Sequence, residues 1–325
     1  MSDEQLGPYV LEHCIGDGGM GRVHKGLHRE SGEPVAIKIL HQELSHDPEM
    51  VERFLREGRA ASRVDHPGVV KILDTGVTDK GLPYLVMEYL QGQSLATHLR
   101  ERGRLPLWEA MRITQELAAA LAAAHARQVI HRDLKPENVI IIPDIEAPKN
   151  ERTKLLDFGI AKLAPEIKGK VRTVTNVMMG TPTYMSPEQC RGSRNITDRT
   201  DVYALGVMLY EMLAGRTPFI CEEPGEYLGR HMYEKPPPLQ TVVPEVSLVM
   251  HWLVDSMLLK EPEARPPMAA VAQALKAAGK LKRELLALRE FADSADSLPS
   301  AASSTSSIPT ASAAPNSPTS SSNRG

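Results

Sequence analysis

The sequence has few cysteines, no excess of basic residues and no long apolar run. Only three of its 325 residues are cysteine, an odd number without a C-x-x-C pair, which argues against a disulfide framework and against a zinc site. The net charge is −3, so nucleic acid is not an expected partner. The apolar share of 42% is nevertheless enough for the core of a soluble globular protein.

No apolar stretch reaches the roughly 20 residues that a membrane-spanning helix needs. The longest one runs from Val202 to Leu213 and contains Glu211. The first residues, Met1 to Gln5, are acidic and polar, unlike a signal peptide. The sequence therefore predicts a cytoplasmic protein with no direct membrane insertion.

A β-rich first part is followed by an α-rich second part. Short apolar runs bounded by turn residues predict strands over 33–40 and 83–89, and Asp47-Pro48-Glu49 opens a helix between them. Apolar periodicity then predicts three helices, over 114–127, 201–214 and 267–278. From residue 293 onward Ser, Ala, Thr and Pro dominate, and such a segment cannot offset an ordering entropy of ~1–2 kcal/mol per residue by burial. We therefore expect a disordered tail there.

Gly16, Gly18 and Gly21 form a G-x-G-x-x-G motif, which dinucleotide-binding folds also use. A dinucleotide site needs a helix that opens at the last glycine, whereas residues 22–27 alternate like a strand and 30–33 form a turn. The motif therefore predicts a strand-turn-strand flap, in which missing Cβ atoms let backbone N–H groups approach phosphate oxygens. A glycine-rich hairpin without a ligand is the alternative that this motif alone leaves open.

Lys38 lies on a predicted strand, on the face opposite Ile37 and Ile39. A lone lysine on a strand usually faces solvent, but Glu57 falls in the gap of an apolar stripe on the following helix, and a carboxylate on an inward face requires a cation. We therefore predict that Lys38 pairs with Glu57, which would hold the lysine against two phosphates. The residues of the stripe are Val51, Phe54, Ala61 and Val64.

The segment from His131 to Asn138, followed by Asp157-Phe158-Gly159, carries polar residues suited to phosphoryl transfer. That reaction needs a group that accepts or orients the proton of the nucleophile, and oxygen ligands for Mg²⁺. Asp133 can supply the first, and Asn138 and Asp157 the second. Each of them alone is more often an N-cap or turn residue, so the indication comes from their joint occurrence in this order.

Taken together, the motifs resemble those of the protein kinase family, and the glycine-rich loop is similar to that of the eukaryotic-like serine/threonine kinases of bacteria. The resemblance covers residues 9–275 and includes Val35-Ala36-Ile37-Lys38 and Ser186-Pro187-Glu188. It implies an α+β, two-lobed protein kinase fold with a small β-rich N-lobe, a larger α-helical C-lobe and ATP in the cleft between them. The expected boundaries are 1–90 for the N-lobe, 91–280 for the C-lobe, 281–292 for a helical extension and 293–325 for the tail.

The resemblance also implies a role for each residue of the site. Asp133 would be the catalytic base, Lys135 would contact the γ-phosphate, and Asn138 and Asp157 would bind two Mg²⁺. Lys38, paired with Glu57, and the three motif glycines would hold the ATP phosphates. The residues expected around adenine are Ile15, Val23, Ala36, Ile140, the gatekeeper Met87, and Glu88 and Leu90 through their backbones.

Two features favour serine and threonine as acceptors in protein substrates. Lys135 lies two residues after Asp133, where tyrosine kinases of the family lack it. Residues 180–184 match the serine/threonine-type segment, in which Thr181 would bond both Asp133 and Lys135. Ile160 further implies a preference for threonine over serine of ~1 kcal/mol.

Thr173 and Thr175 fall where bacterial kinases of this kind autophosphorylate. A phosphothreonine there would form charge-assisted bonds with Arg132, which precedes the expected base, and with Lys162. The resemblance is also compatible with transient self-association, in which one copy of the chain phosphorylates another.

The resemblance also implies two packing roles. Glu188 would pair with Arg265 and so hold the large lobe together, and Asp201 would brace the catalytic loop, residues 131–138, through the backbone of that loop. Two departures stand out. Ala61 occupies a place where many kinases carry a larger apolar residue, which would leave the Glu57 helix easier to switch. The loop over 143–153 is longer than the family norm, and we expect it to be neutral for catalysis.

Two other functions compete with this interpretation. A catalytically inactive kinase fold, acting as a scaffold or nucleotide sensor, usually loses the equivalents of Lys38, Asp133 or Asp157, and all three are present. A small-molecule kinase of similar fold would not be expected to carry the Thr181 segment and Ser-Pro-Glu. A P-loop NTPase is excluded because the sequence contains no G-x-x-x-x-G-K-[ST].

Overall fold

The computed structural model describes residues 5–157, 182–193 and 195–279, apart from the side chain of Glu57. The expected tail, the helical extension, Ile160, Thr173, Thr175 and Thr181 lie outside the described residues. Within the described part no helix is both long and apolar enough to cross a membrane.

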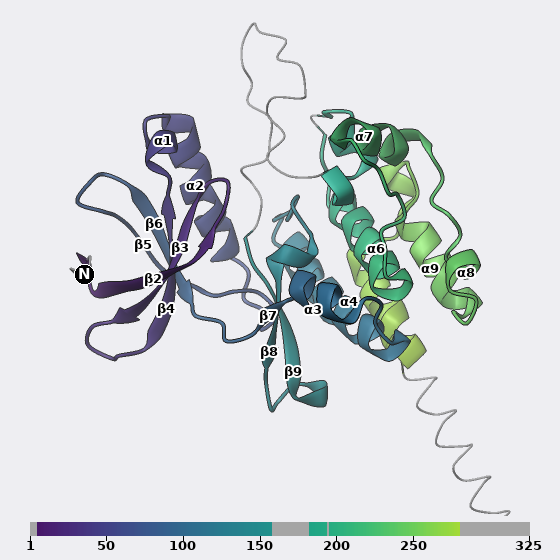
Figure 1. Cartoon of the computed structure of the whole chain (residues 1–325), viewed down its shortest axis with the longest axis horizontal. Coiled ribbons are helices and arrows are strands. Elements are labelled where there is room, and N and C mark those ends of the chain that lie inside the picture. Colours follow the sequence, from purple (N-terminus) through teal and green to yellow (C-terminus); the bar gives the residue numbers. More distant parts are fainter. Residues whose placement is uncertain (1–4, 158–181, 194, 280–325) are drawn as a thin grey trace, which may run out of the picture. The chain divides into compact units, whose positions relative to one another are not determined.

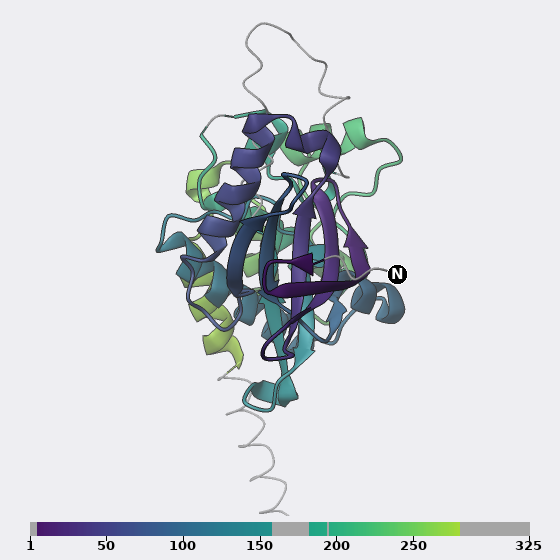
Figure 2. The same cartoon turned by 90° about the vertical axis from the view of Figure 1, so that its left-hand side faces the viewer.

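The first part of the chain forms a six-stranded antiparallel sheet in the order β1-β2-β3-β4-β6-β5. Its strands lie side by side in Figure 2. Those predicted over 33–40 and 83–89 are β4 and β6. The strands are β1 (Gln5–Leu6), β2 (Tyr9–Asp17), β3 (Gly21–His28), β4 (Pro34–Leu40), β5 (Ile72–Val77) and β6 (Pro83–Glu88).

Alternation along β4 gives this sheet two apolar faces. Ile37 is fully buried in a cluster with Tyr9 and Val86 on one face. Leu40, on the opposite face, packs against Phe54 of helix α2 (Pro48–Ala61) and Leu85 of β6. The predicted alternation is therefore confirmed, and Lys38 lies on the face that α2 covers.

Helix α2 begins where the sequence predicts. The side chain of Asp47 accepts a hydrogen bond of 2.9 Å from the backbone N–H of Glu49, and Pro48 occupies the first turn, both of which favour a helix start. The short helix α1 (Gln42–Ser45) precedes it. At its other end, Ala61 and the following Val64 are buried in the core of the second part.

A second, three-stranded sheet, in the order β7-β8-β9, adjoins the helices. It consists of β7 (Gln93–Ser94), β8 (Val139–Pro143) and β9 (Glu151–Leu155). A parallel bridge between Val69 and Leu155 connects the segment before β5 with β9. The long loop predicted over 143–153 is a hairpin between β8 and β9 that contains the short 3-10 helix Pro148–Asn150.

The second part is built from helices around one apolar core (Figure 1). Helix α4 starts at Leu107, earlier than the predicted 114, because Ala110, Met111 and Ile113 continue its buried face. Helix α6 is buried along most of its length and is followed by the capping residue Gly215, whose φ of 72° suits glycine. The helices are α3 (Leu95–Arg102), α4 (Leu107–His125), α5 (Pro187–Cys190), α6 (Arg199–Ala214), α7 (Pro224–Tyr233), α8 (Leu239–Val242), α9 (Leu248–Met257) and residues 268–279.

Candidate active site

Asp201, fully buried in the first turn of α6, holds the start of the catalytic loop. Its carboxylate accepts hydrogen bonds of 2.8 Å from the backbone N–H groups of His131 and Arg132 and one of 2.7 Å from Nε2 of His125. Burial opposes its ionisation, but the hydrogen bond from His125 and the neighbouring donors hold the pKa of Asp201 below its ordinary value. The predicted bracing role is confirmed.

Asp133 lies between two residues of its own loop. Nδ2 of Asn138 donates to the backbone carbonyl of Asp133 at 2.8 Å and to its Oδ2 at 3.3 Å. Nζ of Lys135 lies 3.4 Å from the same Oδ2. The 3-10 helix Pro136–Asn138 supplies the turn that brings Asn138 back to Asp133.

The residue before Asp133 has an uncommon backbone conformation, with φ of 64° at Arg132. Its carbonyl accepts a hydrogen bond of 2.8 Å from Nε2 of Gln189, and Oε1 of that side chain accepts one of 3.0 Å from the backbone N–H of Ser186. Gln189 therefore connects the catalytic loop to the segment around Ser186. No motif pointed to this contact, because the two partners are far apart in the sequence.

Lys38 and Asp157 form an ion pair, with Nζ 2.9 Å from Oδ2. The lysine is only 7% exposed, and Asp157 has a φ of 31°. The backbone N–H of Leu156 donates to the carbonyl of Asn138 at 2.9 Å, and Nε2 of His131 donates to the carbonyl of Leu156 at 2.9 Å. Lys38, Asp157, Asn138 and Asp133 are thereby joined in one continuous network. The predicted contact of Lys38 with Glu57 lies outside the described atoms.

An apolar cluster lies where the sequence predicts the adenine site. It includes four predicted residues, namely Val23, Ala36, Met87 and Leu90. Val70 and Leu156, which the sequence did not single out, belong to the same cluster. Ile15 on β2 is 45% exposed, and Ile140 lies half-buried on β8.

The backbone N–H at the end of β6 already has a hydrogen-bond partner within the protein. The N–H of Glu88 donates to the carbonyl of Lys71 at 3.0 Å, so its carbonyl is the group that could face a ligand. The Glu88 carboxylate accepts a hydrogen bond of 2.8 Å from the backbone N–H of Lys71 and pairs with Lys154. These contacts fix the strand end beside the apolar cluster.

The glycine motif forms the predicted strand-turn-strand flap between β2 and β3. Gly16 pairs with Val23, and the N–H of Gly18 donates to the carbonyl of Gly21 at 3.1 Å. A Cβ at Gly21 would lie 2.1 Å from the carbonyl oxygen of Ile39, so packing against β4 requires glycine there. As the sequence predicts, a strand and not a helix begins at Gly21.

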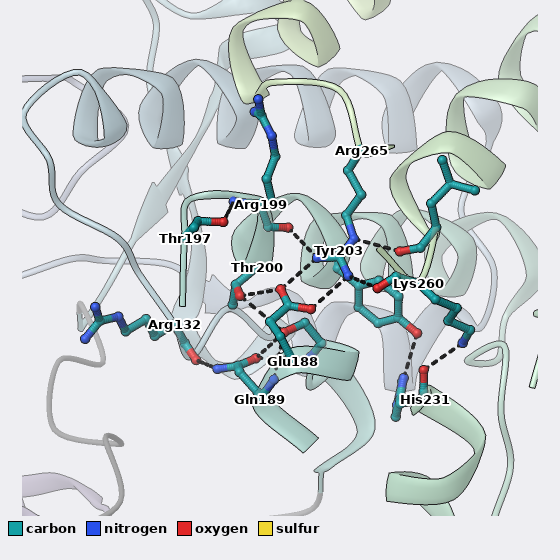
Figure 3. Close-up of polar contacts among 12 residues, drawn as sticks. Arg132, Glu188, Gln189, Thr197, Arg199, Thr200, Tyr203, His231, Lys260 and Arg265 are labelled. Atoms are coloured by element: carbon teal, nitrogen blue, oxygen red, sulfur yellow. Dashed lines mark hydrogen bonds and ion pairs between the residues drawn. The ribbon is translucent and has the colours of Figure 1, made fainter. Parts of the chain in front are cut away.

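Glu188 and Arg265 form a buried, two-pronged ion pair, with oxygen–nitrogen distances of 2.7 and 2.8 Å (Figure 3). The hydroxyl of Thr200 also donates to Glu188, at 2.6 Å. Burial raises the pKa of Glu188, but the bonds from Arg265 outweigh this effect, so its pKa lies below the ordinary value. This pair, predicted from the resemblance, is confirmed.

Comparison with known proteins agrees with this geometry. The sequence matches the protein kinase domain family over residues 9–276. The chain belongs to the protein kinase family. Its fold is similar to the crystal structure of the Mycobacterium tuberculosis PknI kinase domain, with a TM-score of 0.65 and 26% identity over 85% of this chain and 99% of that one. The predicted two-lobed kinase fold is confirmed.

The related sequences are bacterial. The chain is 38% identical over 293 residues to serine/threonine-protein kinase pkn3 of Myxococcus xanthus, a match that covers 87% of this chain and 53% of the relative. It is 41% identical to pkn2 of the same organism, over 84% of this chain and 32% of the relative. With PknA of Mycobacterium tuberculosis the identity is 36%, over 80% and 58%. The chain thus spans about a third to somewhat over half the length of these relatives.

Proposed function

We propose that this chain transfers the γ-phosphate of ATP to serine and threonine hydroxyls of protein substrates. The observation that carries the proposal is the continuous network from Lys38 through Asp157 and Asn138 to Asp133, in which cation, oxygen ligands and base lie together. Relatives named as serine/threonine-protein kinases support the choice of acceptor. The network supports this function over an inactive scaffold, because Lys38, Asp133 and Asp157, which inactive kinase folds usually lack, all belong to it.

The chain's own residues would share the work as follows. Asp133 would accept or orient the proton of the substrate hydroxyl, and Lys135, beside it, would neutralise charge on the transferred phosphoryl group. Lys38 would hold the ATP phosphates from the face of β4. Rigid support from Asp201 matters because positioning and charge stabilisation supply most of the catalysis in phosphoryl transfer.

The donor set also suits Mg²⁺. Asp157 offers a carboxylate, and the Asn138 amide uses its nitrogen in the bonds to Asp133, so its oxygen is the atom that could bind a cation. Carboxylate and amide oxygens are ligands that a hard cation prefers. When bound, Mg²⁺ would supply charge neutralisation on the phosphates. The apolar cluster of Val23, Ala36 and Met87 would take the adenine ring.

Transfer of radiolabelled phosphate from ATP to casein tests this proposal, with the Asp133→Asn variant as the matched control. The wild type should label casein only when Mg²⁺ is present, and the variant should not. Equal labelling by both proteins would show that Asp133 has no such role, and no labelling by a folded wild type would favour a scaffold or sensor.

We further propose that phosphate on Thr173 or Thr175 regulates the activity through Arg132. A cavity of about 280 Å³ between α2 and the start of the catalytic loop is lined by arginines. Within the described part, Nε of Arg132 is buried without a hydrogen-bond partner, and burial lowers the pKa of this guanidinium. A phosphothreonine carries roughly −1.5 to −2 charge and three acceptor oxygens, which suits this cavity. The arginines are Arg56, Arg59, Arg63 and Arg132.

A further inference from the structure

His231, near the end of α7, is fully buried and connects two distant segments. Its Nε2 lies 2.9 Å from the backbone carbonyl oxygen of Thr183, and its Nδ1 lies 2.9 Å from the hydroxyl of Tyr203 on α6. Phe219 packs edge-on against the ring, with centroids 5.1 Å apart, and Tyr227 stacks on it at 6.3 Å. The imidazole is thus held on its edges and faces, and through Nε2 it contacts the backbone of Thr183.

The partners of His231 determine its protonation. A carbonyl oxygen can only accept a hydrogen bond, so Nε2 must carry a proton and donate to Thr183. Burial, together with the neighbouring charge of Lys260, lowers the pKa of His231 to about 4, so the ring is neutral at physiological pH. Nδ1 then accepts from the Tyr203 hydroxyl, and both ring nitrogens are satisfied.

Lys260 holds the end of the helix that carries His231. Its Nζ donates to the carbonyl of His231 at 2.8 Å and to that of Arg230 at 3.3 Å. Both carbonyls lie in the last turn of α7, where a cation is favourable, and that of Arg230 also accepts a hydrogen bond of 3.0 Å from the backbone N–H of Glu234. The ammonium lies 5.0 Å from the ring centroid of Phe219 and 5.8 Å from that of Tyr203. Burial lowers its pKa to about 8.

Residues 182–184, which His231 contacts through Thr183, lie beside the catalytic loop. Thr183 belongs to the 3-10 helix Pro182–Tyr184, directly after the predicted serine/threonine-type Thr181. Next to it, the hydroxyl of Tyr184 donates to Glu211 at 2.7 Å. Burial, Glu211 and then Glu137 raise the pKa of Tyr184. Two residues further on, the backbone N–H of Ser186 donates to Gln189, whose Nε2 donates to the Arg132 carbonyl of the catalytic loop. A 3-10 helix of three residues has little shape of its own, so outside contacts must fix it.

We propose that His231 is a positioning residue that fixes residues 182–184 for binding of the protein substrate, and that Lys260 secures it through the end of α7 (Figure 3). This inference rests on the proposed kinase function. It predicts an effect on the use of the protein substrate and none on the use of ATP, because the Lys38–Asp157 network has no contact with His231 among the interactions described.

The test compares His231→Gln with His231→Asn in steady-state kinetics. A glutamine amide can place an N–H near the position of Nε2 and so keep the bond to Thr183, whereas asparagine is one methylene shorter and reaches only the position of Nδ1. Both variants bury a polar amide, and they differ by one methylene and in the partner of His231 that the amide reaches, Thr183 for glutamine and Tyr203 for asparagine. Melting temperatures of both proteins, and KM for ATP at saturating casein-derived peptide, complete the comparison.

We expect kcat/KM for the peptide to fall about tenfold in the Asn variant relative to the Gln variant, as for the loss of one hydrogen bond, with an unchanged KM for ATP. Lys260→Met should change peptide use in the same direction, whereas Lys235→Met, at an exposed lysine, should not. Equal peptide kinetics of the Gln and Asn variants, or a parallel change in KM for ATP, would overturn the inference. An inactive wild type would instead overturn the proposed function on which it rests.

Discussion

The guanidinium of Arg265 and the carboxylate of Glu188 meet in the core of the helical part, where the two residues are 2% and 4% exposed. All of α6, α7, α8 and α9 lies between them in the chain, and the pair connects the segment around Ser186 to the residues that follow α9. Nε of Arg265 also donates to the carbonyl of Leu259 at 2.7 Å. Loss of the Arg265 side chain would leave the buried carboxylate of Glu188 without its cation.

Arg265→Met should therefore lower the free energy of unfolding by about 3–5 kcal/mol, as expected when one partner of a buried ion pair is removed. Urea denaturation followed by circular dichroism measures this change. Arg191→Met, at an exposed arginine, is the matched control and should stay within about 0.5 kcal/mol of the wild type. A stable Arg265→Met protein would mean that the pair adds little to the fold.

Lys38→Met should abolish phosphoryl transfer while the protein stays folded, because the lysine contributes charge and position rather than core packing. Single-turnover and steady-state assays with ATP and casein measure the loss, and the melting temperature reports the fold. Lys71→Met, at an exposed lysine nearby, should keep its activity. A Lys38→Met protein that retained turnover in the family range of about 1–100 s⁻¹ would refute the role of this lysine.

Glu211 gives a prediction for stability against pH. Burial raises its pKa, although the hydrogen bond from Tyr184 opposes this effect. A carboxyl group whose folded-state pKa is raised stabilises the fold below its unfolded pKa of about 4.5, and this contribution is lost as pH rises through the folded pKa. Glu211→Gln, which can still accept from Tyr184, should raise the melting temperature at pH 7.5, and the gain should shrink as pH falls toward 4.5. A gain that does not depend on pH would contradict the assignment.

Mass spectrometry of the purified kinase should find phosphate on Thr173 or Thr175, and none in the Asp133→Asn variant. The Thr173→Ala, Thr175→Ala double variant should lose most of its activity toward casein, because the arginine cavity would then lack its phosphate. Full activity of the double variant would show that the segment carrying Thr173 and Thr175 needs no phosphate to support catalysis.

Much of the site could be predicted from sequence because its residues lie in short, ordered motifs. Alternation along β4 placed Lys38 on the correct face, and Asp47-Pro48 marked the start of α2. Local patterns could not show which distant residues meet in space. Gln189 with Arg132, and His231 with Thr183, are separated by 57 and 48 residues, so the tertiary fold brings them together.

Other details depend on close approach of the backbone. The sequence suggested that the motif glycines serve phosphate binding, but Gly21 is also required by β4, whose Ile39 carbonyl would collide with any Cβ. In the same way, the apolar cluster around Ala36 and Met87 also contains Val70 and Leu156. Val70 lies just before β5 and Leu156 just after β9, and the bridge between Val69 and Leu155 brings these two segments together. Such partners follow from the tertiary fold and leave no local pattern.

In the proposed mechanism, Asp133 serves the transfer of phosphate to serine and threonine. Three peptides that differ only in a single serine, threonine or tyrosine, incubated with Mg²⁺ and ATP, test it by intact-mass measurement. We expect the serine and threonine peptides to gain one phosphate each, the threonine peptide faster if Ile160 acts as expected. We expect no phosphate on the tyrosine peptide, and none on any peptide with the Asp133→Asn variant. Phosphorylation of the tyrosine peptide alone, or equal rates with and without the Asp133 carboxylate, would contradict it.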